Sequence, residues 1–329
     1  MKSLRILAVL ILLAGGAAGA LYYFAVRPFA GFQDETFVEI PRGASTRSIA
    51  GMLAKAGVIE DSKVFLLMRA LRPSTKLQAG EYRFVGPAST LDVYDRIARG
   101  DVFYFELAIP EGLNMFDIAS VVEKMGLMSP SEFLTAARDP SLIRDLDKTA
   151  PTLEGYLFPD TYRVTRHTSA AELCRILTHR FRSEWKRLGA SVDPHQTVTL
   201  ASLIEKEAAV PADRPLVSAV FHNRLKIGMK LDCDPTTVYA ALLQGRYRGT
   251  IYQSDLASTS PYNTYQHPGL PPGPIANPGI ASLKAALNPA AADYLYFVAS
   301  PDRSGRHVFS KDLASHEVAV TRYRRGASK

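Results

Sequence analysis

The sequence is poor in the residues and patterns that build metal and cofactor sites. Its 329 residues include only two cysteines, Cys174 and Cys233, and contain neither an HExxH nor a CxxC pattern. A GxSxG nucleophile elbow, a phosphate-binding P-loop and a GxGxxG fingerprint are also absent from the sequence. We therefore predict no metal and no cofactor. The sequence leaves open whether the two cysteines pair or stay free.

Charge of one sign is not concentrated in a stripe either. The formal net charge is +7, but the basic residues are dispersed, and their one tight cluster is Arg322, Arg324 and Arg325 near the end of the chain. Nucleic-acid-binding proteins gather such residues on one face, so we predict no nucleic-acid partner. An anionic polymer or an anionic membrane suits this surface. With 47% hydrophobic and 22% charged residues and no repeat, the chain is globular and long enough for two domains.

One long hydrophobic run is present, at the N-terminus. Residues 6–26 carry no charge and would form a helix of roughly 30 Å, enough to cross a bilayer. Lys2 and Arg5 predict that residues 1–5 stay cytoplasmic and that the rest is exported. The alternative is a cleaved signal peptide with a small-residue site at residues 17–20. We favour the uncleaved anchor, because the apolar run continues past that site.

Residues 36–103 are expected to form a small module. Residues 36–40 and 77–85 have the pattern of strands, and between them residues 45–57 and 61–71 have the pattern of two helices. A further helix is expected at residues 91–99. The β-α-α-β order resembles a LysM-like fold, a module type that binds polymers containing N-acetylglucosamine. The alternative is a spacer that only positions the following domain.

The remainder is expected to contain a connecting subdomain at residues 104–150 and a larger mixed α/β domain at residues 151–329. The fold class is thus α+β. Strands are predicted at residues 101–109 and 294–299, and residues 110–112 are expected to form a turn. The predicted helices are at residues 114–125, 129–139, 170–188, 197–210, 214–225, 280–287 and 313–324.

The helix at residues 197–210 is unusual because it carries Glu205 and Glu207 within an apolar run. Two residues correspond to about 200° of rotation, so at most one of them faces a given cleft. Glu205 shares its side with small residues such as Ala201 and Ser202, which would leave room for a bulky ligand. Glu207 lies nearer larger residues such as Leu203. This favours Glu205 for a groove, and the alternative is a helix whose glutamates are simply solvated.

Several loops carry polar and aromatic side chains suited to sugar binding. Residues 154–162 combine aromatics with acids and have no regular pattern, while residues 229–239 carry Asp232 and Asp234. Aromatic faces stack on sugar rings, and carboxylates accept hydrogen bonds from hydroxyls. The alternative for residues 154–162 is a loop whose aromatics fill the core. Residues 269–279 hold four prolines and three glycines and predict a rigid surface turn.

Taken in order, five blocks resemble the endolytic murein transglycosylase family, the MltG or YceG-like proteins. The blocks are residues 154–162 (Glu-Gly-Tyr-Leu-Phe-Pro-Asp-Thr-Tyr), 201–207 (Ala-Ser-Leu-Ile-Glu-Lys-Glu), 223–225 with 234–236 (Asn-Arg-Leu and Asp-Pro-Thr), 262–265 (Tyr-Asn-Thr-Tyr) and 269–275 (Gly-Leu-Pro-Pro-Gly-Pro-Ile). The resemblance covers most of the chain, including the anchor and the LysM-like module.

The resemblance implies cleavage of the β-1,4 bond between N-acetylmuramic acid and N-acetylglucosamine in nascent strands, leaving 1,6-anhydro ends. The first glutamate of Ile-Glu-Lys-Glu, Glu205, is then the catalytic residue. One carboxylate suffices because the C6 hydroxyl of muramic acid attacks C1, whereas an ordinary glycosidase needs two. The residues that the resemblance implies as groove residues are Glu154, Tyr156, Asp160, Tyr262, Asn263 and Tyr265.

The resemblance also implies a single-pass protein of the bacterial inner membrane, with a periplasmic catalytic domain. Its partners would be peptidoglycan glycan strands, the membrane and the peptidoglycan synthases that make new strands. Two alternatives remain open. One is a non-catalytic peptidoglycan-binding scaffold, and the other is a muramidase that uses Asp232 or Asp234 as a second carboxylate.

Overall fold

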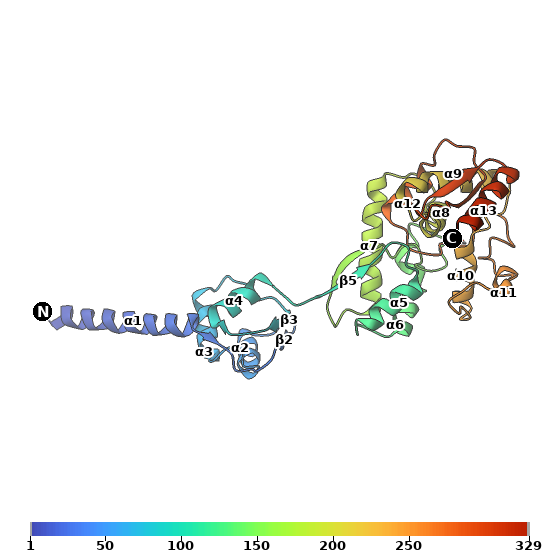
Figure 1. The fold of residues 1–329 in the computed structure, drawn as a ribbon. Helices are drawn as coiled ribbons and strands as arrows, with labels where there is room; N and C mark the ends of the chain where they lie inside the picture. The colour runs from blue at the N-terminus through green and yellow to red at the C-terminus, as the bar shows by residue number, and fades with distance from the viewer. Residues whose placement is uncertain (1, 328–329) are drawn as a thin grey trace. The chain divides into compact units, whose positions relative to one another are not determined.

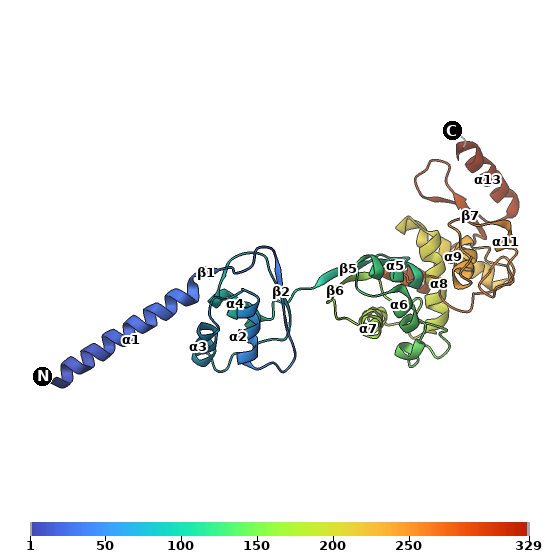
Figure 2. The same cartoon turned by 90° about the horizontal axis from the view of Figure 1, so that it is seen from below.

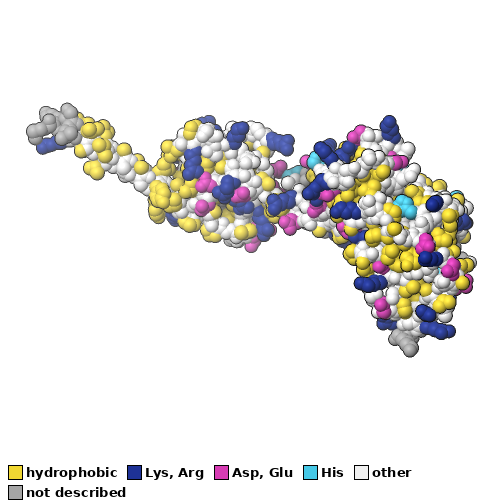
Figure 3. Space-filling view, turned by 90° about the horizontal axis from the view of Figure 1, so that it is seen from above, with side chains coloured by type: hydrophobic (Ala, Val, Ile, Leu, Met, Phe, Trp, Pro, Cys, Tyr) yellow, Lys and Arg dark blue, Asp and Glu magenta, His cyan; other side chains and the backbone are white. Residues whose placement is uncertain are grey.

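The computed structural model describes residues 2–327, and the chain separates into two compact units, Met1–Phe105 and Glu106–Lys329. Figure 1 shows the elements of each unit in chain order. The mixed helix and strand content agrees with the expected α+β class. On the face drawn in Figure 3, Lys and Arg side chains are scattered among acidic ones and form no continuous stripe.

The first unit begins with the long helix α1 (Lys2–Val26). Within it, Arg5–Val26 has a mean hydropathy of 2.1, and its side chains up to residue 20 are exposed. This segment is long and apolar enough to cross a membrane. The C-terminal end of α1 contacts α3 and α4, and Figure 2 shows the rest of the helix projecting away from them.

The rest of this unit has the expected β-α-α-β order. Strands β2 (Thr36–Ile40) and β3 (Gly80–Phe84) pair antiparallel, with Val38 opposite Tyr82. The other elements are α2 (Thr46–Lys55), α3 (Ser62–Leu71), α4 (Thr90–Arg99) and a short pair formed by β1 (Pro28–Phe29) and β4 (Ala88–Ser89). Alternate strand residues and one face of each helix form a single apolar core.

The second unit holds most of the helices. Its strands form two pairs, β5 (Phe105–Ile109) with β6 (Asp160–Val164) and the hairpin β7 (Tyr296–Ala299) with β8 (His307–Ser310). Its helices are α5 (Met115–Lys124), α6 (Pro130–Ala137), α7 (Ala170–Leu188), α8 (Pro194–Glu207), α9 (Arg214–Lys226), α10 (Asp234–Leu243), α11 (Gln253–Leu256), α12 (Ile280–Leu287) and α13 (Leu313–Ala327). Two 3₁₀ turns, η1 (Pro140–Ile143) and η2 (Pro211–Asp213), lie between them.

Strand β6 and helix α10 differ from the sequence expectation. Residues 154–162 were expected to have no regular structure, yet Asp160 begins strand β6. Helix α10 was not expected, although Pro235 in its first turn is typical of a helix start. Both segments looked irregular because proline and acidic residues hide the short apolar pattern that follows them.

Helix α8 lies at the centre of the second unit and packs against α9, α10 and α12. All residues from Val198 to Ile204 are buried, so the helix is enclosed on every side before its last turn. It begins earlier than predicted, after the N-cap Asp193, and ends earlier, at Glu207, because Ala208 is extended. Both glutamates therefore emerge where the enclosing helices and loops meet.

The expected open strip beside Glu205 is absent, and this prediction was wrong. Ala201 and Ser202 are completely buried, and the Ser202 hydroxyl accepts a hydrogen bond from Ile275 N at 3.1 Å. The small side chains allow the loop after residue 269 to pack directly on α8. Gly155 fits the same contact, since a Cβ there would lie 2.5 Å from Pro274 and 2.8 Å from Val198.

Candidate active site

The last turn of α8 directs Glu205 and Glu207 into different surroundings. One carboxylate oxygen of Glu205 accepts a hydrogen bond from Arg214 Nη2 at 2.9 Å, and the other accepts one from the backbone N–H of Gly279 at 2.9 Å. Its side chain is only 5% exposed. The C-terminal end of a helix disfavours negative charge, so these two donors supply the compensation that a carboxylate needs there.

Arg214 reaches Glu205 because the chain reverses sharply after α8. The turn η2 leads directly into α9, whose first residue is Arg214. The same nitrogen, Nη2, lies 3.5 Å from Glu111 Oε2, so one guanidinium faces two carboxylates. Neither Glu111 nor Arg214 was expected at this site from the sequence. A positive charge in the first turn of a helix is electrostatically unfavourable. The position of Arg214 in such a turn was the feature of the sequence that could have pointed to a role for it.

Glu111 belongs to the turn after β5, which backbone hydrogen bonds fasten to the loop before α12. The N–H of Gly112 donates to Asn277 O at 3.0 Å, and the N–H of Asn277 donates to Leu113 O at 2.9 Å. A Cβ on Gly279 would lie 1.8 Å from Glu111 Oε1, so only glycine allows this carboxylate to approach. Glu111, Glu205, Arg214 and Gly279 thus form one compact cluster, called here the Glu205 cluster.

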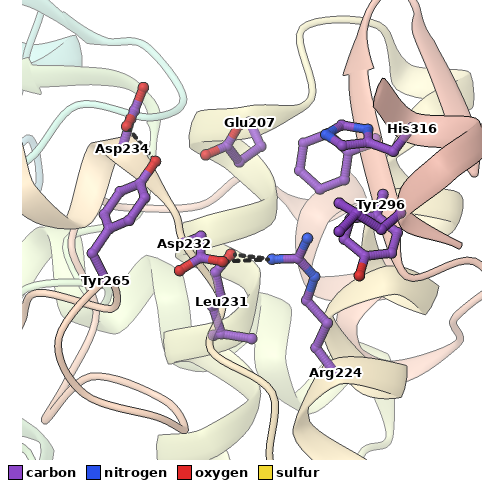
Figure 4. A pocket seen from close by; sticks show the side chains of 10 residues that line it. Glu207, Arg224, Leu231, Asp232, Asp234, Tyr265, Tyr296 and His316 are labelled. Carbon is purple, nitrogen blue, oxygen red and sulfur yellow. Dashed lines mark hydrogen bonds and ion pairs between the residues drawn. The ribbon is translucent and has the colours of Figure 1, made fainter. Parts of the chain in front are cut away.

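Glu207 faces a cavity of about 390 Å³, shown in Figure 4. Burial raises the pKa of Glu207, and its carboxylate accepts a hydrogen bond from the Cys233 thiol at 3.1 Å. The other residues that line this cavity, called here the Glu207 cavity, are Arg224, Leu231, Asp232, Asp234, Tyr265, Tyr296, Phe297, Leu313 and His316.

The cavity wall combines acids, one arginine and aromatic rings. Arg224 lies 3.5 Å from Asp232, and its guanidinium sits 5.3 Å from the centre of the Tyr296 ring. His316 stacks on the same Tyr296 ring, with ring centres 5.1 Å apart. Burial raises the pKa of Asp232, which also has an unusual positive φ of 48°. Asp232 and Asp234 therefore belong with Glu207, while the carboxylate that shares a partner with Glu205 is Glu111.

Three of the six predicted groove residues are interior residues. Glu154, Tyr156 and Asn263 are at most 1% exposed, so they do not face a groove. Glu154 accepts hydrogen bonds from Met115 N and Asn277 Nδ2, and burial raises its pKa to about 8. The polar atoms of all three residues bond to other buried side chains or to backbone groups.

The hydrogen bonds of the other two interior residues show the same supporting role. The Tyr156 hydroxyl donates to Asp147 Oδ2 at 2.5 Å, and that carboxylate also contacts His195 Nδ1 at 2.7 Å. The Asn263 amide donates to Leu256 O and Ser258 O, which closes the loop after α11.

The other three predicted groove residues are at least partly exposed. Tyr265 lines the Glu207 cavity, and its hydroxyl donates to Asp234 at 2.7 Å. Tyr262 is half-buried, with its ring 5.2 Å from that of Tyr239, and burial raises the pKa of Tyr262 to about 12. Asp160 forms an ion pair with Arg180 at 2.6 Å. Of these three residues only Tyr265 lines the Glu207 cavity, and Glu205 does not line it.

Cys174 and Cys233 are both free and buried, so they do not form a disulfide. Within residues 2–327, no group of three or more His, Cys, Asp or Glu side chains is arranged to hold a metal ion. At the end of α8, a carboxylate bonded to a guanidinium and a backbone N–H has the groups that proton transfer uses.

Comparison with known proteins gives a consistent result. The model of the YceG-like family matches residues 38–322. An endolytic murein transglycosylase of Bacillus subtilis is 35% identical over 87% of this chain and 84% of its own length. A Streptococcus pneumoniae protein with the same name is 28% identical over 95% of this chain, which spans only 63% of that relative.

A solved structure shows the same similarity in three dimensions. The crystal structure of a yceG-like protein from Listeria monocytogenes matches with a TM-score of 0.56 at 33% identity. The match covers 87% of this chain and 99% of the listerial chain.

Proposed function

Because this chain belongs to the YceG-like family, we propose that it is an endolytic murein transglycosylase with Glu205 as its catalytic residue. The enzyme cuts the β-1,4 bond between N-acetylmuramic acid and N-acetylglucosamine within nascent glycan strands and so ends their elongation. The observation that carries the assignment is the Glu205 cluster. It brings Glu111, Arg214 and Gly279 to one carboxylate at the end of a buried helix.

The reaction needs one protein carboxyl group. Protonated Glu205 gives its proton to the glycosidic oxygen as the bond from C1 of muramic acid to that oxygen breaks. The C6 hydroxyl of the same sugar then forms a bond to C1, and the Glu205 carboxylate takes the C6 hydroxyl proton. Glu205 ends protonated as it began, and no water is consumed. An enclosed site favours this course, since water is the competing nucleophile.

The geometry sets a condition on substrate binding. Both oxygens of Glu205 accept hydrogen bonds in the structure, from Arg214 and Gly279. The glycosidic oxygen has to approach one of the two Glu205 oxygens to receive a proton. One of the two hydrogen bonds to Glu205 must therefore break. Arg214 is the partner on a side chain, and it is the one that moves without any change in the backbone.

The setting of the enzyme is proposed from α1. As an uncleaved anchor, α1 holds the protein in the bacterial inner membrane, with Lys2 and Arg5 on the cytoplasmic side and the chain after Arg27 in the periplasm. The β-α-α-β module at residues 36–103 acts as a LysM-like module that holds the glycan. Cutting new strands beside the membrane brings the enzyme close to the peptidoglycan synthases, and we expect crosslinking in cells to capture them with it.

The proposal is tested with long, purified glycan strands and the soluble chain starting at Gly31. We expect the wild-type protein to shorten the strands from internal positions, with products of intermediate length appearing before disaccharides. The Glu205→Gln variant should bind strands and leave their length unchanged. Strands that stay intact with the wild-type protein would instead support a non-catalytic scaffold.

A further inference from the structure

Arg214 is placed between two carboxylates and makes little use of its capacity to donate. Its Nη2 lies 2.9 Å from Glu205 and 3.5 Å from Glu111, while its Nε is buried without a hydrogen-bond partner. The Arg214 side chain is 11% exposed and that of Glu205 is 5% exposed, whereas Glu111 is 45% exposed. Two members of the group are therefore enclosed and the third reaches solvent.

The position of Glu111 is fixed by the backbone around it. The turn at residues 110–112 is fastened to Asn277, and Lys206 Nζ donates to Gly112 O at 3.2 Å. Gly279 leaves the space that the Glu111 carboxylate occupies, and its own N–H donates to Glu205. The same loop therefore positions both carboxylates on either side of the guanidinium.

The catalytic cycle creates a problem for Arg214. When Glu205 carries the proton that it gives to the leaving group, Arg214 loses its anionic partner while it remains enclosed. An enclosed cation without a partner is strongly unfavourable. Glu111 is the carboxylate close enough to take over, because the two distances from Nη2 differ by less than 1 Å.

We propose that Arg214 passes from Glu205 to Glu111 when substrate binds, which makes Glu111 a positioning residue of the reaction. The transfer frees one oxygen of Glu205 for the glycosidic oxygen, and it stabilises the protonated form of Glu205 relative to its carboxylate. Glu111 does this through Arg214, without touching the reacting atoms. The inference rests on the proposed function, since it assumes that Glu205 works as an acid.

A double-mutant cycle on folding tests the transfer without any substrate. Glu205→Gln imitates the protonated glutamate, so in that variant Arg214 depends on Glu111. We expect Glu111→Gln to lower the melting temperature by at least about 3 °C more in the Glu205→Gln protein than in the wild type. Equal decreases in the two proteins would overturn the proposal.

A kinetic measurement then tests the role in the reaction. Glu111→Gln should lower kcat at least about tenfold with little change in KM, because the loss lies in the acid step. Glu106→Gln, on the exposed face of β5, is the matched control and should leave both constants unchanged. An unchanged kcat in Glu111→Gln overturns the inference. The folding cycle uses no glycan, so its result is separate from a failure of the proposed function, which an inactive wild-type protein would show.

Discussion

Glu205 and Glu207 leave the same turn of α8, but their surroundings differ in almost every respect. Glu205 accepts hydrogen bonds from Arg214 and from the backbone N–H of Gly279, and Arg214 also lies near Glu111. Glu207 faces a cavity and a thiol, and burial raises its pKa. The comparison teaches that the position of a glutamate on an apolar helix does not define its chemistry. The segments that fold back onto the helix end define it.

The largest expected difference between Glu205 and Glu207 is in the effect of their replacement on the rate of strand cleavage. Glu205→Gln should reduce strand cleavage by about 10²–10⁴-fold, the usual contribution of general acid and base catalysis. Glu207→Gln, the matched change two residues away, should stay within about tenfold of the wild type. Initial rates on the same glycan strands measure both. The reverse order of effects would assign the acid to the Glu207 cavity.

A smaller loss of activity is expected when a substitution displaces the residues of the Glu205 cluster. In Gly279→Ala the new methyl group would meet Glu111 at 1.8 Å, so the carboxylate and the loop have to shift. Misplacement of about 1 Å at an active site costs on the order of 10²-fold in rate, and we expect kcat to fall by about 10–100-fold. Gly86→Ala is the control, because a Cβ there meets no atom within 4 Å. Equal activity of the two variants would show that the close approach is unimportant.

A third prediction concerns the support behind the Glu205 cluster. Glu154 accepts a hydrogen bond from Asn277, which is bonded in turn to the turn at residues 110–112. Replacement by Gln keeps the size but turns one acceptor into a donor. We expect Glu154→Gln to lower the free energy of unfolding by about 1–3 kcal/mol. Thermal unfolding followed by circular dichroism measures the change, and no change would mean that Glu154 supports nothing.

The pH dependence of this effect has a definite sign. Burial raises the pKa of Glu154 from 4.5 to about 8, so the folded protein holds this proton more tightly than the unfolded chain. Its contribution to stability is complete below about pH 4.5 and is lost as the pH rises towards 8. The gap in melting temperature between the wild type and Glu154→Gln should therefore narrow from pH 5 to pH 8. A gap that widens would contradict the raised pKa.

The smallest effect is expected on the Glu207 side. Cys233 donates a weak thiol hydrogen bond to Glu207, and burial raises the pKa of this thiol. Cys233→Ala should lower the unfolding free energy by about 1 kcal/mol and change the cleavage rate less than about twofold. Calorimetry and strand cleavage measure the two quantities. A large loss of activity would move Cys233, and Glu207 with it, into the catalytic machinery.

Much of the architecture was predictable because local patterns carry it. The apolar run of α1, the β-α-α-β order of the first unit and most helices of the second follow from periodicity and capping residues. Glu205 was proposed from the sequence because a carboxylate in an apolar helix-forming run is unusual, and its catalytic role stays a prediction. The limits of α8 and the helix α10 were less accessible, since proline and acidic residues interrupt their patterns.

The surroundings of Glu205 could not be predicted in the same way. Glu111 and Gly279 lie 94 and 74 residues from it in the chain, and only the fold brings them together. Glu154, Tyr156 and Asn263 looked like sugar-binding residues, yet they are buried and hold loops in place. A sequence shows that polar and aromatic residues occur together, but it does not show whether they face solvent or one another.

The most direct measurement is the mass of the new chain ends that the wild-type protein leaves on purified glycan strands. If protonated Glu205 releases the leaving sugar and the C6 hydroxyl attacks, every new end is 1,6-anhydro-N-acetylmuramic acid, with no water gained. Ends heavier by one water would contradict the account, because they require a second carboxylate to activate water. A muramidase mechanism would then replace it.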